Sequence, residues 1–190
     1  MKRSFVRLLI GIISLLMLIL LTACGNGMEA NKKADKYSFK KTNEKISEKD
    51  MKSQIELYLD SNESILKGIE KMKSQDTDQQ IETIDTVKKQ LGENNKNFEN
   101  LIKKNNIPES YSEANKVLEY FKQTNNLLGD FKKKLSDVVN KNDYSKLKNI
   151  ITLSSKYDNE LNGYYENELK QFIEEKGIDS NLFEQKLFNK

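Results

Sequence analysis

The stretch TDQQIETIDTVKKQLGENNKNFENLIKKN, residues 77–105, decides the fold. Its apolar residues recur at spacings of three and four, the period of an α-helix with one buried face; they are Ile81, Ile84, Val87, Leu91, Phe98, Leu101 and Ile102. Thr77 followed by Gln80 predicts a capping box at the helix start. We therefore expect one long helix over residues 77–105.

The same period precedes this stretch. Ser47 with Asp50 approximates a second capping box, and Ile46 and Met51 occupy the positions of a hydrophobic staple. The apolar stripe that follows predicts a first helix running to about residue 74; it contains Met51, Ile55, Tyr58, Leu59, Ile65, Leu66, Ile69 and Met72.

Two further stripes follow the central stretch. Pro108 suits the first turn of a third helix, which the stripe from Ala114 to Val138 predicts. A fourth stripe runs from Leu147 to Ile173, and Gly177 is a natural C-terminal stop. A short fifth segment is expected beyond, with Leu182, Phe183, Leu187 and Phe188.

No stretch of useful length alternates apolar and polar residues, so the expected fold class is all-α. Helices of roughly 30 residues would be ~45 Å long, and short connections favour antiparallel neighbours. The prediction is an antiparallel up-down bundle of about four long helices with a short C-terminal helix, covering residues 46–190.

The N-terminus carries a different pattern. Lys2, Arg3 and Arg7 precede an apolar run from Leu8 to Leu21, as in a secretory signal peptide. An uncleaved membrane anchor is the alternative, but Arg7 and the polar residues 25–27 leave less than the ~20 apolar residues that a spanning helix needs.

This segment closes on Leu21, Thr22, Ala23 and Cys24, the only cysteine. The tetrapeptide resembles the lipobox of bacterial lipoproteins. The resemblance implies that the Cys24 thiol receives a diacylglycerol, and that signal peptidase II recognises Leu21, Thr22 and Ala23 and cuts before Cys24. The predicted organisation is a lipoprotein signal peptide at 1–23, the lipidated Cys24 with a flexible basic tether over 24–45, and the bundle domain.

Charge excludes some partners. The chain has 32 Lys and Arg against 29 Asp and Glu, and the predicted signal peptide holds three of the basic residues and no acidic one, which leaves 29 against 29. A neutral domain without arginine does not support nucleic-acid binding. The absence of histidine removes the commonest general base and metal ligand. We therefore expect no enzyme, no metal and no cofactor.

Polar residues interrupt the middle of each stripe. In an antiparallel bundle they would approach a common level and line a small polar cavity; they are Asn62, Asn94 or Asn95, Asn125, and Ser154 or Ser155. The alternatives are that a buried Asn fixes helix register, or that helix rotation exposes these residues.

Surface contacts have two candidates. Tyr157, Tyr164 and Tyr165 cluster in the fourth stripe, and Tyr165 is the better candidate for an exposed contact. The run Lys132, Lys133, Lys134 would either solvate the surface or touch an anionic polymer.

The expected function is that of a lipoprotein on the outer face of a Gram-positive cytoplasmic membrane, acting as a binding or interaction module at the cell envelope. Its partners would be membrane lipid through Cys24, and a cell-wall polymer or another envelope protein. Beyond the lipobox, the chain looks like the small helical lipoproteins of bacilli, some of cell-wall-binding type. The alternatives are an immunity or exclusion lipoprotein against a bacteriocin or phage, and a small-ligand receptor using the bundle interior.

Overall fold

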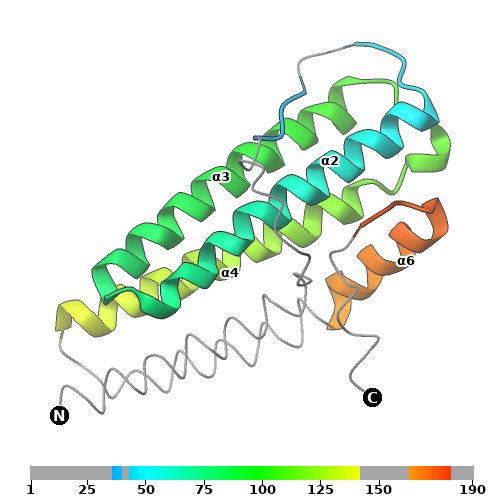
Figure 1. Ribbon diagram of the computed structural model, residues 1–190. Helices are drawn as coiled ribbons and strands as arrows, with labels where there is room; N and C mark the ends of the chain where they lie inside the picture. Colours follow the sequence, from blue (N-terminus) through cyan, green and yellow to red (C-terminus); the bar gives the residue numbers. More distant parts are fainter. Residues whose placement is uncertain (1–35, 40–42, 142–162, 181–190) are drawn as a thin grey trace.

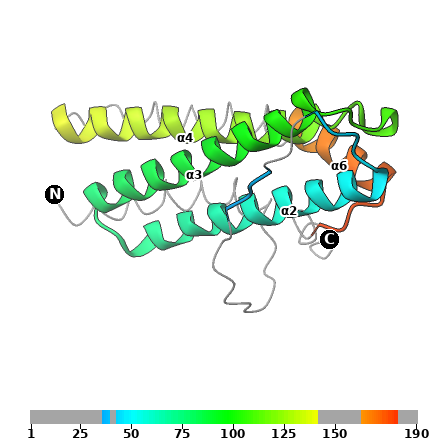
Figure 2. The same ribbon diagram turned by 90° about the horizontal axis from the view of Figure 1, so that it is seen from above.

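The computed structural model describes residues 36–39, 43–141 and 163–180. In these ranges the chain is mostly helical and forms no strand, so the all-α prediction is confirmed there. Its elements are α2 (Glu48–Leu66), the 3-10 helix η1 (Lys67–Ser74), α3 (Thr77–Lys104), the 3-10 helix η2 (Glu109–Tyr111), α4 (Asn115–Lys141) and α6 (Glu166–Lys176). Helices α2, α3 and α4 lie side by side along their lengths in both views (Figures 1 and 2).

Helix α2 begins where the sequence places it. Ser47 Oγ accepts a hydrogen bond from the backbone N–H of Asp50 at 3.1 Å, and Ile46 and Met51 are both buried beside this cap. The Ser47 hydroxyl also donates to the Asp50 carboxylate at 2.7 Å. The helix tightens into η1 at Lys67 and ends at Ser74, as expected.

The N-cap of helix α3 lies one residue before the expected cap. Asp76, not Thr77, is the N-cap: its carboxylate accepts from the N–H of Gln79 at 2.9 Å, while Gln79 Oε1 accepts from the N–H of Asp76 at 3.2 Å. Buried Gln80 instead donates from Nε2 to the carbonyls of Met72 and Gln75, at 3.0 and 3.1 Å. The chemistry of the capping box was predicted correctly and its position was not.

The connection to α4 also differs. Pro108 precedes the short helix η2, and α4 starts only at Asn115, so the proline lies in the connection rather than in the first turn of the long helix. Buried Tyr111 in η2 packs edge-on against Phe172 of α6, with ring centroids 6.3 Å apart. This contact holds α6 beside the start of α4.

Helix α6 covers the C-terminal part of the fourth predicted stripe. It ends as predicted at Gly177, whose φ of 55° is left-handed and whose N–H donates to the carbonyl of Glu174 at 3.1 Å. The N–H of Ile178 donates to the carbonyl of Ile173 at 3.0 Å, which completes a Schellman-type stop. The rest of that stripe, residues 142–162, and the fifth segment beyond residue 180 lie outside the described residues.

The apolar stripes face one another. Tyr58 of α2 stacks on Phe98 of α3 with ring centroids 4.2 Å apart, and Phe121 of α4 meets Tyr58 edge-on at 5.3 Å. Lys132 of α4 pairs with Asp85 near the start of α3, whereas Lys122 pairs with Glu99 near its end. Helices α3 and α4 therefore run in opposite directions. None of the helices within the described ranges combines the length and apolarity needed to cross a membrane.

Part of the predicted tether contacts the helices. The N–H of Asn43 donates to the carbonyl of Lys104 at 2.8 Å, and Glu44 and Ile46 exchange backbone hydrogen bonds with Asn106 at 3.0 and 3.1 Å. Further back, Tyr37 is buried against α2 and α3. Residues 36–39 and 43–45, which composition assigns to a flexible tether, thus pack on the domain.

Candidate functional site

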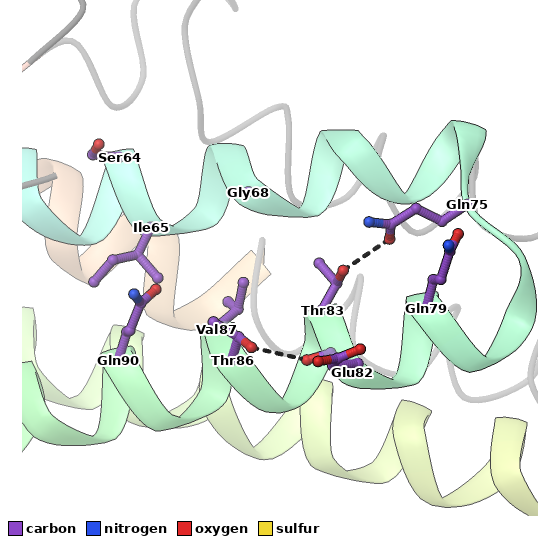
Figure 3. Close-up of a pocket in the computed structure, with 10 residues that line it drawn as sticks. All are labelled: Ser64, Ile65, Gly68, Gln75, Gln79, Glu82, Thr83, Thr86, Val87 and Gln90. Atoms are coloured by element: carbon purple, nitrogen blue, oxygen red, sulfur yellow. Dashed lines mark hydrogen bonds between the residues drawn. The ribbon is translucent and has the colours of Figure 1, made fainter. Parts of the chain in front are cut away.

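A groove of about 730 Å³ follows the seam between α2–η1 and α3 (Figure 3). Its lining is mostly uncharged and polar and consists of Ser64, Ile65, Gly68, Gln75, Gln79, Glu82, Thr83, Thr86, Val87 and Gln90. Gly68 lies directly across the seam from Val87, whose Cγ2 would be 3.5 Å from a Cβ at position 68. This is an ordinary van der Waals distance, so an alanine would also fit at position 68.

Hydrogen bonds hold part of this lining. Thr83 Oγ1 donates to Gln75 Oε1 across the seam at 2.8 Å, and Thr86 Oγ1 donates to the carbonyl of Glu82 at 3.0 Å. Within the part of the chain that the structure describes, the side chains of Ser64 and Gln90 make no hydrogen bond. A hydroxyl and an amide are therefore available to a ligand at the mid-helix end of the groove.

The electrostatics of the groove favour an uncharged ligand. Its lining has one carboxylate, that of Glu82, and no lysine. Without a cation, it offers no counter-charge to a phosphate or a carboxylate. In the described ranges no three Cys, Asp or Glu side chains gather closely enough to hold a metal ion. The arrangement is suited to binding through hydrogen bonds.

Beyond the mid-helix end of the groove lies a buried polar layer formed by Ser61, Asn62 and Asn94. Asn94 Nδ2 donates to Ser61 Oγ at 2.8 Å and to Asn62 Oδ1 at 2.9 Å, and both Asn side chains have no exposed surface. Asn94 Oδ1 has no hydrogen-bond partner among the described residues. Asn62 and Asn94, named from the sequence, thus meet at one level and bond to each other.

Asn95 takes a separate role in the same turn. Its Oδ1 accepts a hydrogen bond from the Tyr58 hydroxyl at 2.6 Å, and both residues are buried. Burial raises the pKa of the Tyr58 phenol well above its ordinary value. The phenol therefore stays protonated and keeps donating over the whole physiological range.

Of the other sequence-derived polar candidates, the structure describes Asn125, which makes no hydrogen bond to this layer. Asn125 is half-buried on α4 and faces α3, with its Nδ2 3.5 Å from where a Cβ at Gly92 would lie. Ser154 and Ser155 lie outside the described residues. In the described residues the polar layer is thus formed by α2 and α3. A layer to which all four helices contribute stays a prediction.

The expectation for Tyr165 needs correction. Tyr164 is 63% exposed, whereas Tyr165 is partly buried and packs against the core, with the two rings edge-on at 5.2 Å. The exposed tyrosine of this pair is Tyr164. Lys132, in the basic run, pairs with Asp85 at 2.5 Å and so does not present an unpaired charge.

Sequence reasoning missed Ser61 and the amide-rich groove. Ser61 directly precedes Asn62, and the polar groove residues flank the apolar stripes at helical spacing. The polar residues along the edge of each stripe were therefore the sequence feature that could have indicated the groove.

No family model, curated protein or solved structure matches the chain.

Proposed function

We propose that the chain is a lipid-anchored binding module on the outer face of a Gram-positive cytoplasmic membrane. The observation that carries the proposal is the sequence Leu21, Thr22, Ala23, Cys24 at the end of a basic and then apolar N-terminal segment. A diacylglycerol on Cys24 would supply two acyl chains, and basic residues nearby would add attraction to anionic lipid. Six lysines lie between Gly25 and Lys45, against three acidic residues.

The proposed architecture of the module is an antiparallel up-down bundle over residues 46–190. It is supported by the opposite directions of α3 and α4 and by α6, which coincides with the end of the fourth stripe. The proposed role of the module is binding, since the groove presents amides and hydroxyls that can hold a partner through hydrogen bonds.

The groove indicates an uncharged partner. An anionic wall polymer would meet Glu82 and find no cation among the lining residues. Gln75, Gln79 and Gln90 instead offer both donors and acceptors, which suits the hydroxyls or amides of a neutral partner. The proposed partner is therefore an uncharged polar segment of a cell-envelope component.

Lipid attachment is tested by Cys24→Ala in cells fed an alkyne-labelled fatty acid. Label on the unchanged protein should be strong and should disappear in the variant, which should run as the unprocessed precursor or be released. Tyr164→Ala, an exposed change 140 residues after Cys24 in the sequence, should label normally. Persistent label on Cys24→Ala would overturn the anchor.

The groove is tested by Thr86→Lys, which places a cation and added bulk on its wall. Binding of the purified mature chain to isolated envelopes should fall at least fivefold, whereas Asn126→Lys, the same charge change on an exposed face of α4, should have no effect. An uncharged partner also predicts binding that barely changes with salt. Equal binding by both variants would exclude the groove as the contact surface.

A small-ligand receptor is a second candidate, favoured by the size of the groove. Small-molecule sites commonly enclose roughly 300–1,000 Å³, and the groove lies within that range at about 730 Å³. A ligand present at about 100 times its Kd should stabilise the fold by about 2.7 kcal/mol. Thermal shift against neutral sugars and amides, repeated on Thr86→Lys, checks this.

A further inference from the structure

Tyr37 is held by its backbone as well as by its ring, although it belongs to no helix. Its N–H donates to Ser61 Oγ of α2 at 3.2 Å, and its carbonyl accepts from Asn97 Nδ2 of α3 at 2.9 Å. The residue is only 4% exposed. Helix α2 therefore binds the backbone N–H of this residue, and helix α3 binds its carbonyl.

The ring of Tyr37 fills an aromatic pocket. It meets Tyr58 edge-on at 5.4 Å and Phe98 at 6.0 Å. Its hydroxyl donates to Gln54 Oε1 at 3.3 Å. Edge-on pairs of this kind contribute roughly 0.5–1.5 kcal/mol each beyond area burial. The pocket therefore selects an aromatic side chain with a polar tip.

The neighbouring residues hold more loosely. Lys36 is exposed and pairs with Glu93 at 2.5 Å, which lowers the pKa of that carboxyl, while Ser38 is exposed. Phe39 is half-buried against the core. The contacts thus concentrate on one residue, and its flanks are accessible.

Among the residues that the structure describes, the groups that bond or pack against Tyr37 belong to α2 and α3. The pocket is therefore complete without a covalent connection to residue 37. Backbone hydrogen bonds that give affinity, together with a side-chain pocket that gives specificity, are the means by which proteins recognise extended peptides. The geometry is that of a peptide-recognition site occupied by the protein's own chain.

The same seam continues into the groove. Ser64 lies one helical turn beyond Ser61, and Gln90 lies one turn from Asn94, so the two sites share the same helix faces. A longer peptide with its aromatic residue in the Tyr37 pocket would have a polar path along which to extend.

We propose that this pocket recognises an aromatic residue in an extended peptide of a partner protein, and that Tyr37 occupies it as a displaceable internal ligand. The proposal rests on the binding role proposed above and names its partner as a protein segment. Tyr37 lies nine residues before Ile46, so its effective concentration at the pocket is on the order of millimolar. A partner peptide would therefore bind by competing with it.

The test uses the mature chain with Tyr37→Ala, which empties the pocket. The probes are the blocked peptide Asp-Lys-Tyr-Ser-Phe-Lys, which copies residues 35–40, and the same peptide with Ala in place of Tyr. The variant should bind the Tyr peptide at least tenfold more tightly than the Ala peptide. The unchanged protein and Tyr164→Ala, which keeps the pocket filled, should each bind the Tyr peptide at least tenfold more weakly than Tyr37→Ala does.

Equal affinity of Tyr37→Ala for the two peptides would overturn the proposal. Should that variant fail to fold by circular dichroism, the unchanged protein still decides it: millimolar Tyr peptide should speed hydrogen exchange of the Tyr37 N–H several-fold, and the Ala peptide should not. An unchanged exchange rate would also overturn it. Neither measurement needs a lipid anchor or the Thr86 wall of the groove, so this failure is distinct from failure of the proposed function.

Discussion

The buried pair Asn62–Asn94 gives a prediction whose size follows from its contacts. Replacing Asn94 by Leu removes two hydrogen bonds, to Ser61 Oγ and to Asn62 Oδ1. These contribute about 1 kcal/mol each, and a buried acceptor left unpaired costs about 1–3 kcal/mol more. Leu regains part of this through apolar burial, so we expect Asn94→Leu to lower the free energy of unfolding by about 1–3 kcal/mol.

The companion change shows whether the pair acts as a unit. Asn62→Leu should cost about 1–2 kcal/mol, because Asn94 loses one of its two acceptors and keeps Ser61. The double variant should cost less than the sum by about 1–2 kcal/mol, since neither amide then leaves the other unpaired. Asn94 Oδ1 is unpartnered among the described residues, so its removal adds no loss.

Urea unfolding followed by circular dichroism measures these differences. With a urea m-value of about 2 kcal/mol/M, a change of 2 kcal/mol moves the midpoint by about 1 M. Asn126→Leu, at an exposed site on α4, should stay within about 0.5 kcal/mol of the unchanged protein. If the two single effects add within about 0.3 kcal/mol, Asn62 and Asn94 are not coupled and the reasoning is refuted.

Three other changes have definite expectations. Gly177→Ala should lower the free energy of unfolding by about 1 kcal/mol in thermal or urea unfolding, because φ at this open site is +55°. Gly163→Ala, also in open space but without a positive φ, should not lower it, and equal losses in the two variants would contradict this reasoning. Asp76→Ala should cost about 1 kcal/mol through loss of the N-cap of α3, seen as a lower urea midpoint, and a midpoint equal to that of the unchanged protein would argue against this cap. Burial raises the pKa of Tyr58, so its stabilising effect is complete below its ordinary value near 10 and declines as pH rises further. Tyr58→Phe should therefore flatten the loss of stability above pH ~10 by up to about 1.4 kcal/mol per pH unit, and an unchanged alkaline slope would count against a buried, protonated phenol.

The helices were predictable from the sequence because burial of one face imposes a period that can be read directly. The N-caps were harder to predict. Asp76 and Thr77 both precede the same apolar run and are both good N-cap residues, so only the path of the backbone selects Asp76. Adjacent positions present the same difficulty on a helix surface. Tyr164 and Tyr165 lie about 100° apart around the axis, and rotation of the helix decides which is exposed.

The site was harder to predict than the fold. Asn62 and Asn94 could be placed at a common level because each interrupts an apolar stripe near its middle. The Tyr37 pocket could not be predicted, because a single aromatic residue in a lysine-rich segment shows no periodic pattern. Its hydrogen-bond partners Ser61 and Asn97 lie 24 and 60 residues away in the sequence. Contacts of such long sequence separation arise only when two helices have already packed.

The docking of Tyr37 bears on how far the protein could reach from a membrane. With a lipid on Cys24, as proposed, 13 residue steps separate the anchor from Tyr37, whereas 19 steps separate it from Asn43, the next residue with a backbone hydrogen bond to the helical domain. Fully extended, these correspond to about 45 Å and about 67 Å. Because accessible volume grows with the cube of distance, docking of Tyr37 would confine the domain to about one third of the space. Displacing Tyr37 would lengthen the free chain between Cys24 and the helical domain. Binding of a partner peptide in the Tyr37 pocket would therefore increase the distance that the domain can reach from the bilayer.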